Sequence, residues 1–185
     1  MFNILKKLIK EIAMKSITKT FYKIGNFSSI EYPCNAVSGA EYISIGNNFT
    51  AHKGLWLAVY NVPEFEKPKI NIGNGVCINY DCQITAINSI IIGNDVLMGS
   101  RVLITDHSHG EITKDELAKA PLKRRLYSKG PVVIGNRVWI GSGAAIMPGV
   151  TIGDNCVIGA NSVVTKSFPA NSIIGGNPAK IIRQL

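Results

Sequence analysis

Two of the chain's three histidines lie in one short polar stretch, Asp106-His107-Ser108-His109. An imidazole titrates near neutral pH, so either histidine can take a proton from a hydroxyl group as a general base. Asp106 can support either imidazole through a hydrogen bond. The stretch is polar and lies at a break in an apolar pattern, which favours a functional role. The third histidine, His52, stands alone in an irregular segment, and we predict it to be a surface residue.

The element that must position these histidines is a strict six-residue repeat. Aliphatic residues recur at positions 134, 140, 146, 152, 158 and 164. Four residues after each of them comes a second inward position, which is occupied by Val138, Ala144, Val150, Cys156, Ser162 and Phe168. A six-residue period matches neither an amphipathic helix nor a long strand, but it fits a short strand followed by a corner. Stacked triangular coils of such strands bury a continuous core, so the predicted fold is an all-β solenoid, a parallel β-helix.

The same repeat also precedes the histidines, and it then stops. The earlier aliphatic positions are Ile72, Ile78 and Ile84, followed by Ile92, Met98 and Ile104. Residues 106–131 form a long loop excursion that begins with the two histidines. A solenoid does not need such a loop for its stability, and long loops in compact domains are commonly functional. We therefore expect the excursion to carry the chemistry.

The first 24 residues differ from the rest of the chain. Their apolar residues fall on roughly one helical face and their lysines lie largely elsewhere, so we predict an amphipathic helix over residues 1–24. Residues 25–185 then form the β-helix domain, with a closing segment at 170–185. The helix can cap the open end of the solenoid or dock on the cytoplasmic face of a membrane. We expect the capping role.

Composition excludes several classes of protein. The net charge is +8, but much of it comes from six lysines against Glu11 in residues 1–24. Aromatic and basic residues do not alternate as they do in proteins that stack bases, so no nucleic acid partner is expected. No apolar run is long enough to span a membrane, and the early lysines break any signal-peptide core. The four cysteines form no CxxC pair, and Cys82 and Cys156 occupy inward positions. We expect a cytoplasmic protein, with any membrane contact made peripherally through residues 1–24.

Several motifs together resemble one family. They are the hexads, the histidine loop, Val138-Trp139-Ile140-Gly141-Ser142, Val164-Thr165-Lys166 and the ending Gly-Asn-Pro-Ala-Lys. In this combination the chain resembles the hexapeptide-repeat O-acetyltransferases. The pattern is most similar to the galactoside and maltose acetyltransferases and to the sugar acetyltransferases of O-antigen and capsule synthesis. The resemblance covers residues 70–185 well and residues 1–70 only loosely.

The resemblance implies a left-handed β-helix that assembles as a homotrimer. Acetyl-CoA then lies in the groove between subunits, and a histidine acts as general base on a sugar hydroxyl that attacks the thioester directly. The backbone N–H at the Ser142 position is the implied donor to the oxyanion. The implied coenzyme-binding positions are Trp139, Ser142, Ala160, Thr165 and Lys166, with Lys180 and Arg183 available for phosphates.

The resemblance also suggests which histidine is the base. In galactoside-type enzymes the catalytic histidine follows the hexad aliphatic by five residues, and counting from Ile104 leads to His109. We therefore expect His109 to be the base and His107 to orient the loop or the acceptor, although a shorter loop would reverse these roles. On the acceptor side, Asn79 matches a sugar-contacting position, and Asp81 and Asp106 are further candidates for substrate contact.

Three other functions are compatible with parts of the sequence. A γ-type carbonic anhydrase needs three zinc ligands, but His107 and His109 are too close together for that family's spacing, so no metal is expected. A structural β-helix explains the hexads but gives no role to the histidine loop or to Thr165 and Lys166. An amino-sugar N-acetyltransferase is the closest alternative, since the same base and coenzyme groove would serve an amine. The identity of the acceptor stays open.

Overall fold

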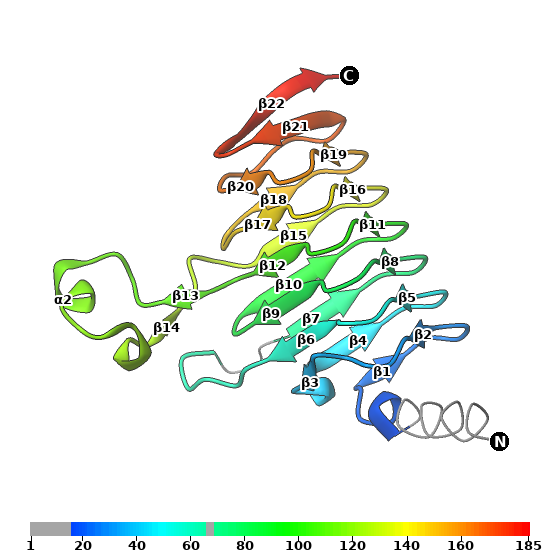
Figure 1. The fold of residues 1–185 in the computed structure, drawn as a ribbon, viewed down its shortest axis with the longest axis horizontal. Coiled ribbons are helices and arrows are strands. Elements are labelled where there is room, and N and C mark those ends of the chain that lie inside the picture. Colours follow the sequence, from blue (N-terminus) through cyan, green and yellow to red (C-terminus); the bar gives the residue numbers. More distant parts are fainter. Residues whose placement is uncertain (1–15, 66–68) are drawn as a thin grey trace.

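The protein is described by a computed structural model over residues 16–65 and 69–185. Most of its strands are short and run parallel in three sheets, which the chain visits in turn (Figure 1). Sheet A contains β1 (Lys23–Ile24), β4 (Ile43–Ile45), β7 (Lys69–Ile72), β10 (Ser89–Ile92), β15 (Val132–Ile134) and β18 (Thr151–Ile152). Sheet B contains β2 (Ser29–Ile30), β5 (Thr50–Ala51), β8 (Cys77–Ile78), β11 (Leu97–Met98), β16 (Trp139–Ile140), β19 (Val157–Ile158), β21 (Ser172–Gly176) and β22 (Ala179–Gln184). Sheet C contains β3 (Ala36–Ser38), β6 (Trp56–Val59), β9 (Gln83–Ala86), β12 (Leu103–Thr105), β17 (Ala145–Ile146) and β20 (Val163–Val164).

The aliphatic residues of the repeat stack on one another inside the three sheets. In sheet A the strand register aligns Ile45, Ile72, Ile92, Ile134 and Ile152, and all five are buried. The second inward positions are buried as well, including Cys82 and Cys156. Because adjacent coils place identical aliphatic side chains in register, each new coil extends the same core. The predicted stack of short parallel strands is confirmed, and the arrangement is consistent with a β-helix.

A ladder of side-chain amides stabilises the corner between sheets A and B. The backbone N–H of Asn47 donates to Oδ1 of Asn74, that of Asn74 to Asn94, that of Asn94 to Asn136, and that of Asn136 to Asp154, at 2.8 to 2.9 Å. The next residue in each corner has a positive φ, for example 56° at Asp95 and 54° at Arg137. Asn, Asp and Gly adopt this left-handed conformation most readily, which explains the polar corners of the repeat.

Two insertions leave the coils at the corner between sheets C and A. One lies between β6 and β7, and the other is the excursion of residues 106–131 between β12 and β15. The excursion holds β13 (Ser108–His109), α2 (Lys114–Leu117), the 3-10 turn η2 (Pro121–Lys123) and β14 (Leu126–Tyr127), and it projects to one side of the coils (Figure 1). Strands β13 and β14 pair antiparallel. An ion pair of 2.6 Å between Arg125 and Glu64 joins the two insertions.

The two ends of the coils differ from the repeat. The segment predicted as an N-terminal helix lies mostly outside the described residues, although residues 16–18 are helical. Strand β1 already pairs with β4 at Lys23 and Ile24, so the helix predicted to reach residue 24 ends earlier and the coils begin before residue 25. At the other end β21 and β22 form an antiparallel hairpin within the predicted closing segment. Within residues 16–65 and 69–185, no helix has the length and apolar character that a membrane span requires.

Candidate active site

A buried carboxylate anchors the histidine loop to the coil before it. Asp106 follows β12 directly, and its side chain is fully buried. One carboxylate oxygen accepts the backbone N–H of Ile87 at 2.9 Å and the other accepts that of Asn88 at 2.8 Å. Ile87 and Asn88 form the same corner one coil earlier, between β9 and β10. The carboxylate is therefore held by backbone groups that cannot move without disturbing the sheets.

The same carboxylate orients His107. Its Oδ1 lies 3.0 Å from the imidazole Nδ1, and the His107 side chain is only 11% exposed. The hydroxyl of Thr105 lies 3.3 Å from the same nitrogen, and the Tyr60 ring meets the imidazole edge to face. We assign the Nδ1 proton to the hydrogen bond with Asp106, because a carboxylate accepts and cannot donate when ionised. Nε2 then keeps its lone pair, which is the arrangement that a general base requires.

His107 and His109 open on one hollow of about 340 Å³. Its lining comes from the outer face of sheet C, the first insertion and the β13–β14 hairpin, and comprises Trp56, Tyr60, Gln83, Thr85, His107, His109 and Leu126. His109 is exposed, and its side chain has no hydrogen bond partner in the described part of the chain. The structure therefore brings both predicted histidines to one hollow, but the buried Asp106 carboxylate contacts only His107 of the two.

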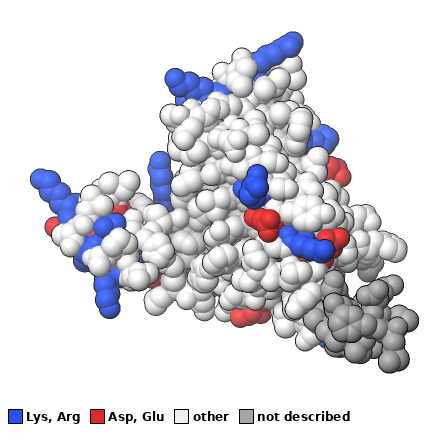
Figure 2. Space-filling view, viewed as in Figure 1, with Lys and Arg blue, Asp and Glu red and all other residues white. Residues whose placement is uncertain are grey.

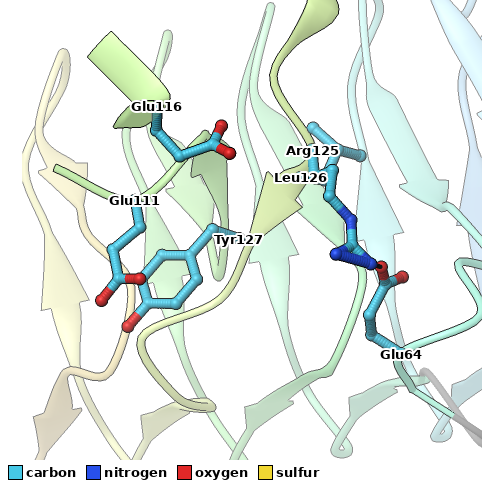
Figure 3. A pocket seen from close by; sticks show the side chains of 6 residues that line it. All are labelled: Glu64, Glu111, Glu116, Arg125, Leu126 and Tyr127. Carbon is cyan, nitrogen blue, oxygen red and sulfur yellow. Dashed lines mark hydrogen bonds and ion pairs between the residues drawn. The ribbon is translucent and has the colours of Figure 1, made fainter. Parts of the chain in front are cut away.

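A second hollow of about 190 Å³ shares Leu126 with the first. Figure 3 shows the side chains that line this second hollow. Arg125 reaches Glu64 there, and Glu116 of α2 accepts a hydrogen bond of 2.6 Å from Lys119. Glu111 and Tyr127 also line this hollow. This hollow is acidic, since three glutamates and a single arginine line it.

A third hollow, of about 270 Å³, lies on the other side of the β13–β14 hairpin. It is lined by Ser108, Gly110, Ile112, Tyr127, Lys129, Met147, Pro148 and Thr165. It therefore links the histidine loop to Thr165, one of the predicted coenzyme positions. The neighbouring Lys166 is exposed, and its ammonium lies 5.7 Å from the centre of the Phe168 ring.

The other predicted site residues lie at a different corner. Asn79 and Asp81 lie between β8 and β9, Ser142 lies between β16 and β17, and Ala160 lies between β19 and β20, all at the corner between sheets B and C. The side chain of Asn79 donates to the Met98 carbonyl at 2.8 Å. Within one chain these residues and the histidines are thus on separate corners.

Two N–H groups of the later coils at that corner are not used in hydrogen bonds within the part of the chain that the structure describes. Among the described residues, no hydrogen bond partner is found for the backbone N–H of Ser142 or of Ala160. Both residues are exposed, and so is Trp139 on the outer face of β16. Lys180 and Arg183 are exposed on β22, and Figure 2 shows basic side chains over this end of the molecule and around the excursion.

Several site features were not predicted from the sequence. His52 is half-buried instead of a simple surface residue: its ring stacks on Tyr80 at 4.9 Å, and its Nδ1 lies 3.4 Å from a Glu31 oxygen. Trp56 and Gln83 were missed as lining residues. Each directly precedes an inward aliphatic of sheet C, so aligning the irregular early coil with its successor would have placed both on the outer face.

Comparison with known proteins gives the family. The pattern described as bacterial transferase hexapeptide (six repeats) matches residues 131–166. Over 181 residues the chain is 36% identical to a protein of Escherichia coli K12 described as "Putative lipopolysaccharide biosynthesis O-acetyl transferase WbbJ", with 96% of this chain and 87% of the relative covered. The chain belongs to the hexapeptide-repeat acetyltransferase family. The family resemblance predicted from the sequence is confirmed. The expectation that the protein is an enzyme of the acyltransferase class is confirmed with it.

Solved structures agree with this family assignment. A galactoside acetyltransferase in complex with coenzyme A is 31% identical, with a TM-score of 0.58 and coverage of 91% of this chain and 67% of that one. AntD, an N-acyltransferase from Bacillus cereus, matches with a TM-score of 0.74, and the match covers 94% of this chain and 88% of the AntD chain. The identity is only 21%, so this similarity shows the fold alone. Among the residues that the structure describes, no three His, Cys, Asp or Glu side chains are grouped to hold a metal ion.

Proposed function

We propose that this family member transfers acetyl from acetyl-CoA to a sugar hydroxyl, in the synthesis of a bacterial surface polysaccharide. The pairing of His107 with the buried Asp106 carries the proposal, because it provides an oriented general base beside an open hollow. The relative named for lipopolysaccharide biosynthesis spans nearly the whole chain, which supports the polysaccharide role. All four cysteines are free, in keeping with the reducing cytoplasm, where we expect the enzyme to act.

In the proposed mechanism His107, rather than His109, removes the proton. Nε2 takes it from the acceptor hydroxyl as the oxygen attacks the thioester carbonyl carbon. The tetrahedral oxyanion is stabilised by a backbone N–H, for which Ser142 is the candidate, since its N–H has no partner in the described residues. Breaking of the carbon–sulfur bond then releases the coenzyme thiolate, which recovers the proton from the imidazolium. Asp106 stabilises the positive imidazolium between these two steps.

We infer that two subunits complete each site. The histidines and Thr165 lie at the corner between sheets C and A, whereas Ser142 and Ala160 lie at the corner between sheets B and C. A closed symmetric assembly brings one corner of a subunit against a different corner of its neighbour. We propose a homotrimer of left-handed coils, in which the pantetheine arm runs past Ser108 and Thr165. Lys166, Lys180 and Arg183 then serve the coenzyme phosphates.

The test is an assay of acetyl transfer with matched acceptors. Purified protein receives acetyl-CoA and either a methyl hexopyranoside or the corresponding 2-amino sugar. Release of free coenzyme thiol is followed with time, and the product is located by mass spectrometry. O-acetylated hexoside is the expected product. Transfer to the amine alone would replace this proposal by the N-acetyltransferase alternative.

A further inference from the structure

We propose that the hollow beside His107 is built for an uncharged pyranose ring, which stacks on Trp56 and hydrogen-bonds to Gln83. The inference rests on the proposed function, because it specifies the acceptor of that same site. It divides surface sugars into two classes, since neutral hexoses fit and sugar acids do not.

Trp56 provides an aromatic platform on a rigid strand. It lies on the outer face of β6, and the residue is 38% exposed. Its neighbours Leu55 and Leu57 are fully buried, so the backbone cannot rotate the indole away from the hollow. The C–H groups on one face of a pyranose ring form an apolar surface that packs on such an aromatic face. His107 lines the same hollow, so a ring on Trp56 presents a hydroxyl to the base.

Gln83 is the polar partner of this platform. It lies directly beside Trp56 in the register of β6 and β9. Its side-chain amide has no hydrogen bond partner in residues 16–65 and 69–185, whereas Thr85, further along the same strand, bonds to Thr105 at 3.3 Å. An amide carries both a donor and an acceptor, so Gln83 can bind two adjacent hydroxyls of one sugar. A half-buried free amide at the edge of the hollow is thus suited to a hydroxyl-rich ligand.

The charges around the hollow select against anionic sugars. None of its lining residues is Lys, Arg, Asp or Glu. The adjoining hollow beyond Leu126 carries Glu64, Glu111 and Glu116, and its arginine is already paired with Glu64 (Figure 3). Glu116 is likewise paired with Lys119, so Glu111 is the glutamate without an ion-pair partner among the described residues. Apart from the two histidines, a uronic or sialic acid carboxylate would therefore be desolvated without a cationic partner and would face the charge of Glu111.

Binding can be tested without the reaction, because the chain has only two tryptophans, Trp56 and Trp139. In Trp139→Phe protein, methyl β-D-galactopyranoside or methyl β-D-glucopyranoside titrated into the millimolar range should change the emission of Trp56. In Trp56→Phe protein the same sugars should leave the emission of Trp139 unchanged. Methyl β-D-glucuronide should change neither signal. An equal response of Trp56 to the glucuronide and to the hexosides, or no response to any of them, would overturn the inference.

Kinetics give a second test. Trp56→Ala and Gln83→Ala should each raise the acceptor KM by about 3- to 10-fold and leave the acetyl-CoA KM unchanged. Trp56→Phe keeps an aromatic face and should recover most of the loss. Ile91→Ala on sheet A is a matched control, since Ile91 is also 38% exposed, and it should change neither constant. An unchanged acceptor KM in Trp56→Ala overturns the platform but leaves O-acetyl transfer intact. The absence of O-acetylated hexoside with the wild-type protein would instead overturn the proposed function.

Discussion

The imidazole Nδ1 of His107 lies 3.0 Å from Oδ1 of Asp106, and the same carboxylate accepts the backbone N–H groups of Ile87 and Asn88. The orientation of the proposed base is therefore tied, through Asp106, to the corner of the preceding coil. The Thr105 hydroxyl and the Tyr60 ring also contact the imidazole.

The two histidines should respond differently to removal. His107→Ala should lower kcat by about 10²- to 10⁴-fold, the usual contribution of a positioned general base, with little change in the acetyl-CoA KM. His109→Ala should lose much less, because His109 has no orienting partner among the described residues. Steady-state kinetics with a competent sugar acceptor measure both values. A fully active His107→Ala variant together with an inactive His109→Ala variant would restore the assignment made from the sequence.

Asp106 acts through His107, so its effect should depend on the presence of the histidine. Asp106→Asn replaces one carboxylate oxygen by an NH₂ group, which does not accept hydrogen bonds. The single remaining oxygen cannot accept from both backbone N–H groups and from the imidazole. We expect kcat to fall by about 10- to 100-fold. In the His107→Ala background the same change should cost little further activity, because the group that Asp106 orients is already gone. Equal losses in both backgrounds would show that Asp106 has only a structural role.

The periodicity of the sequence was sufficient to predict a stack of short parallel strands, but not to show which histidine lies beside the buried carboxylate. Residues such as Ile134 and Val138 specify the coil locally, because every coil repeats the same packing. The gapless count from Ile104 favoured His109, and it could not reveal that the N–H groups of Ile87 and Asn88 fix Asp106 beside His107. That contact joins two coils, and no local pattern encodes it. Trp56 was missed for a similar reason, since its coil lacks regular hexads and only the register with Gln83 shows its outward face.

Asp154 should make part of the stability dependent on pH. Hydrogen bonds from the backbone and side chain of Asn136, together with the charge of Arg137, lower the pKa of this carboxyl. Since its folded-state pKa lies below the unfolded value of about 3.9, the stabilisation is present above that value and is lost as the pH falls through the folded pKa. Urea unfolding should show Asp154→Asn less stable than wild type at pH 7 and nearly equal to it in strong acid.

The control for this prediction is a residue of the same ladder that does not titrate. Asn94→Ala removes an acceptor for the Asn74 N–H and should lower the urea midpoint by a similar amount at both pH values. A constant deficit of Asp154→Asn across the same pH range would assign its effect to packing and not to ionisation.

Basic residues at the C-terminal end should bind the coenzyme phosphates. Lys166→Ala and Arg183→Ala should each raise the acetyl-CoA KM by about 3- to 10-fold, with less effect on kcat, since an exposed charge pair contributes at most about 1 kcal/mol. Lys114→Ala on the exposed helix α2 is the charge-matched control and should change neither constant. Unchanged constants in both test variants would place the coenzyme elsewhere.

The last prediction concerns the shared site. Light scattering should give a mass near three times the 20.0 kDa of one chain, and a monomer at micromolar concentration would contradict the assembly. Ser142→Pro removes the backbone N–H proposed for the oxyanion and should lower kcat by about 10²- to 10³-fold. Ser142→Ala keeps that N–H and should retain most of the turnover.

Mixing two inactive proteins then tests where the site lies. His107→Ala and Ser142→Pro subunits are unfolded together and refolded as mixed trimers. If each site takes His107 from one subunit and Ser142 from its neighbour, a quarter of the sites in a random equal mixture contain both intact residues, and about a quarter of wild-type activity should return. If both residues acted within one chain, every site would keep one defect and no activity would return. Recovered activity therefore requires a site between subunits, because no chain in the mixture carries both residues.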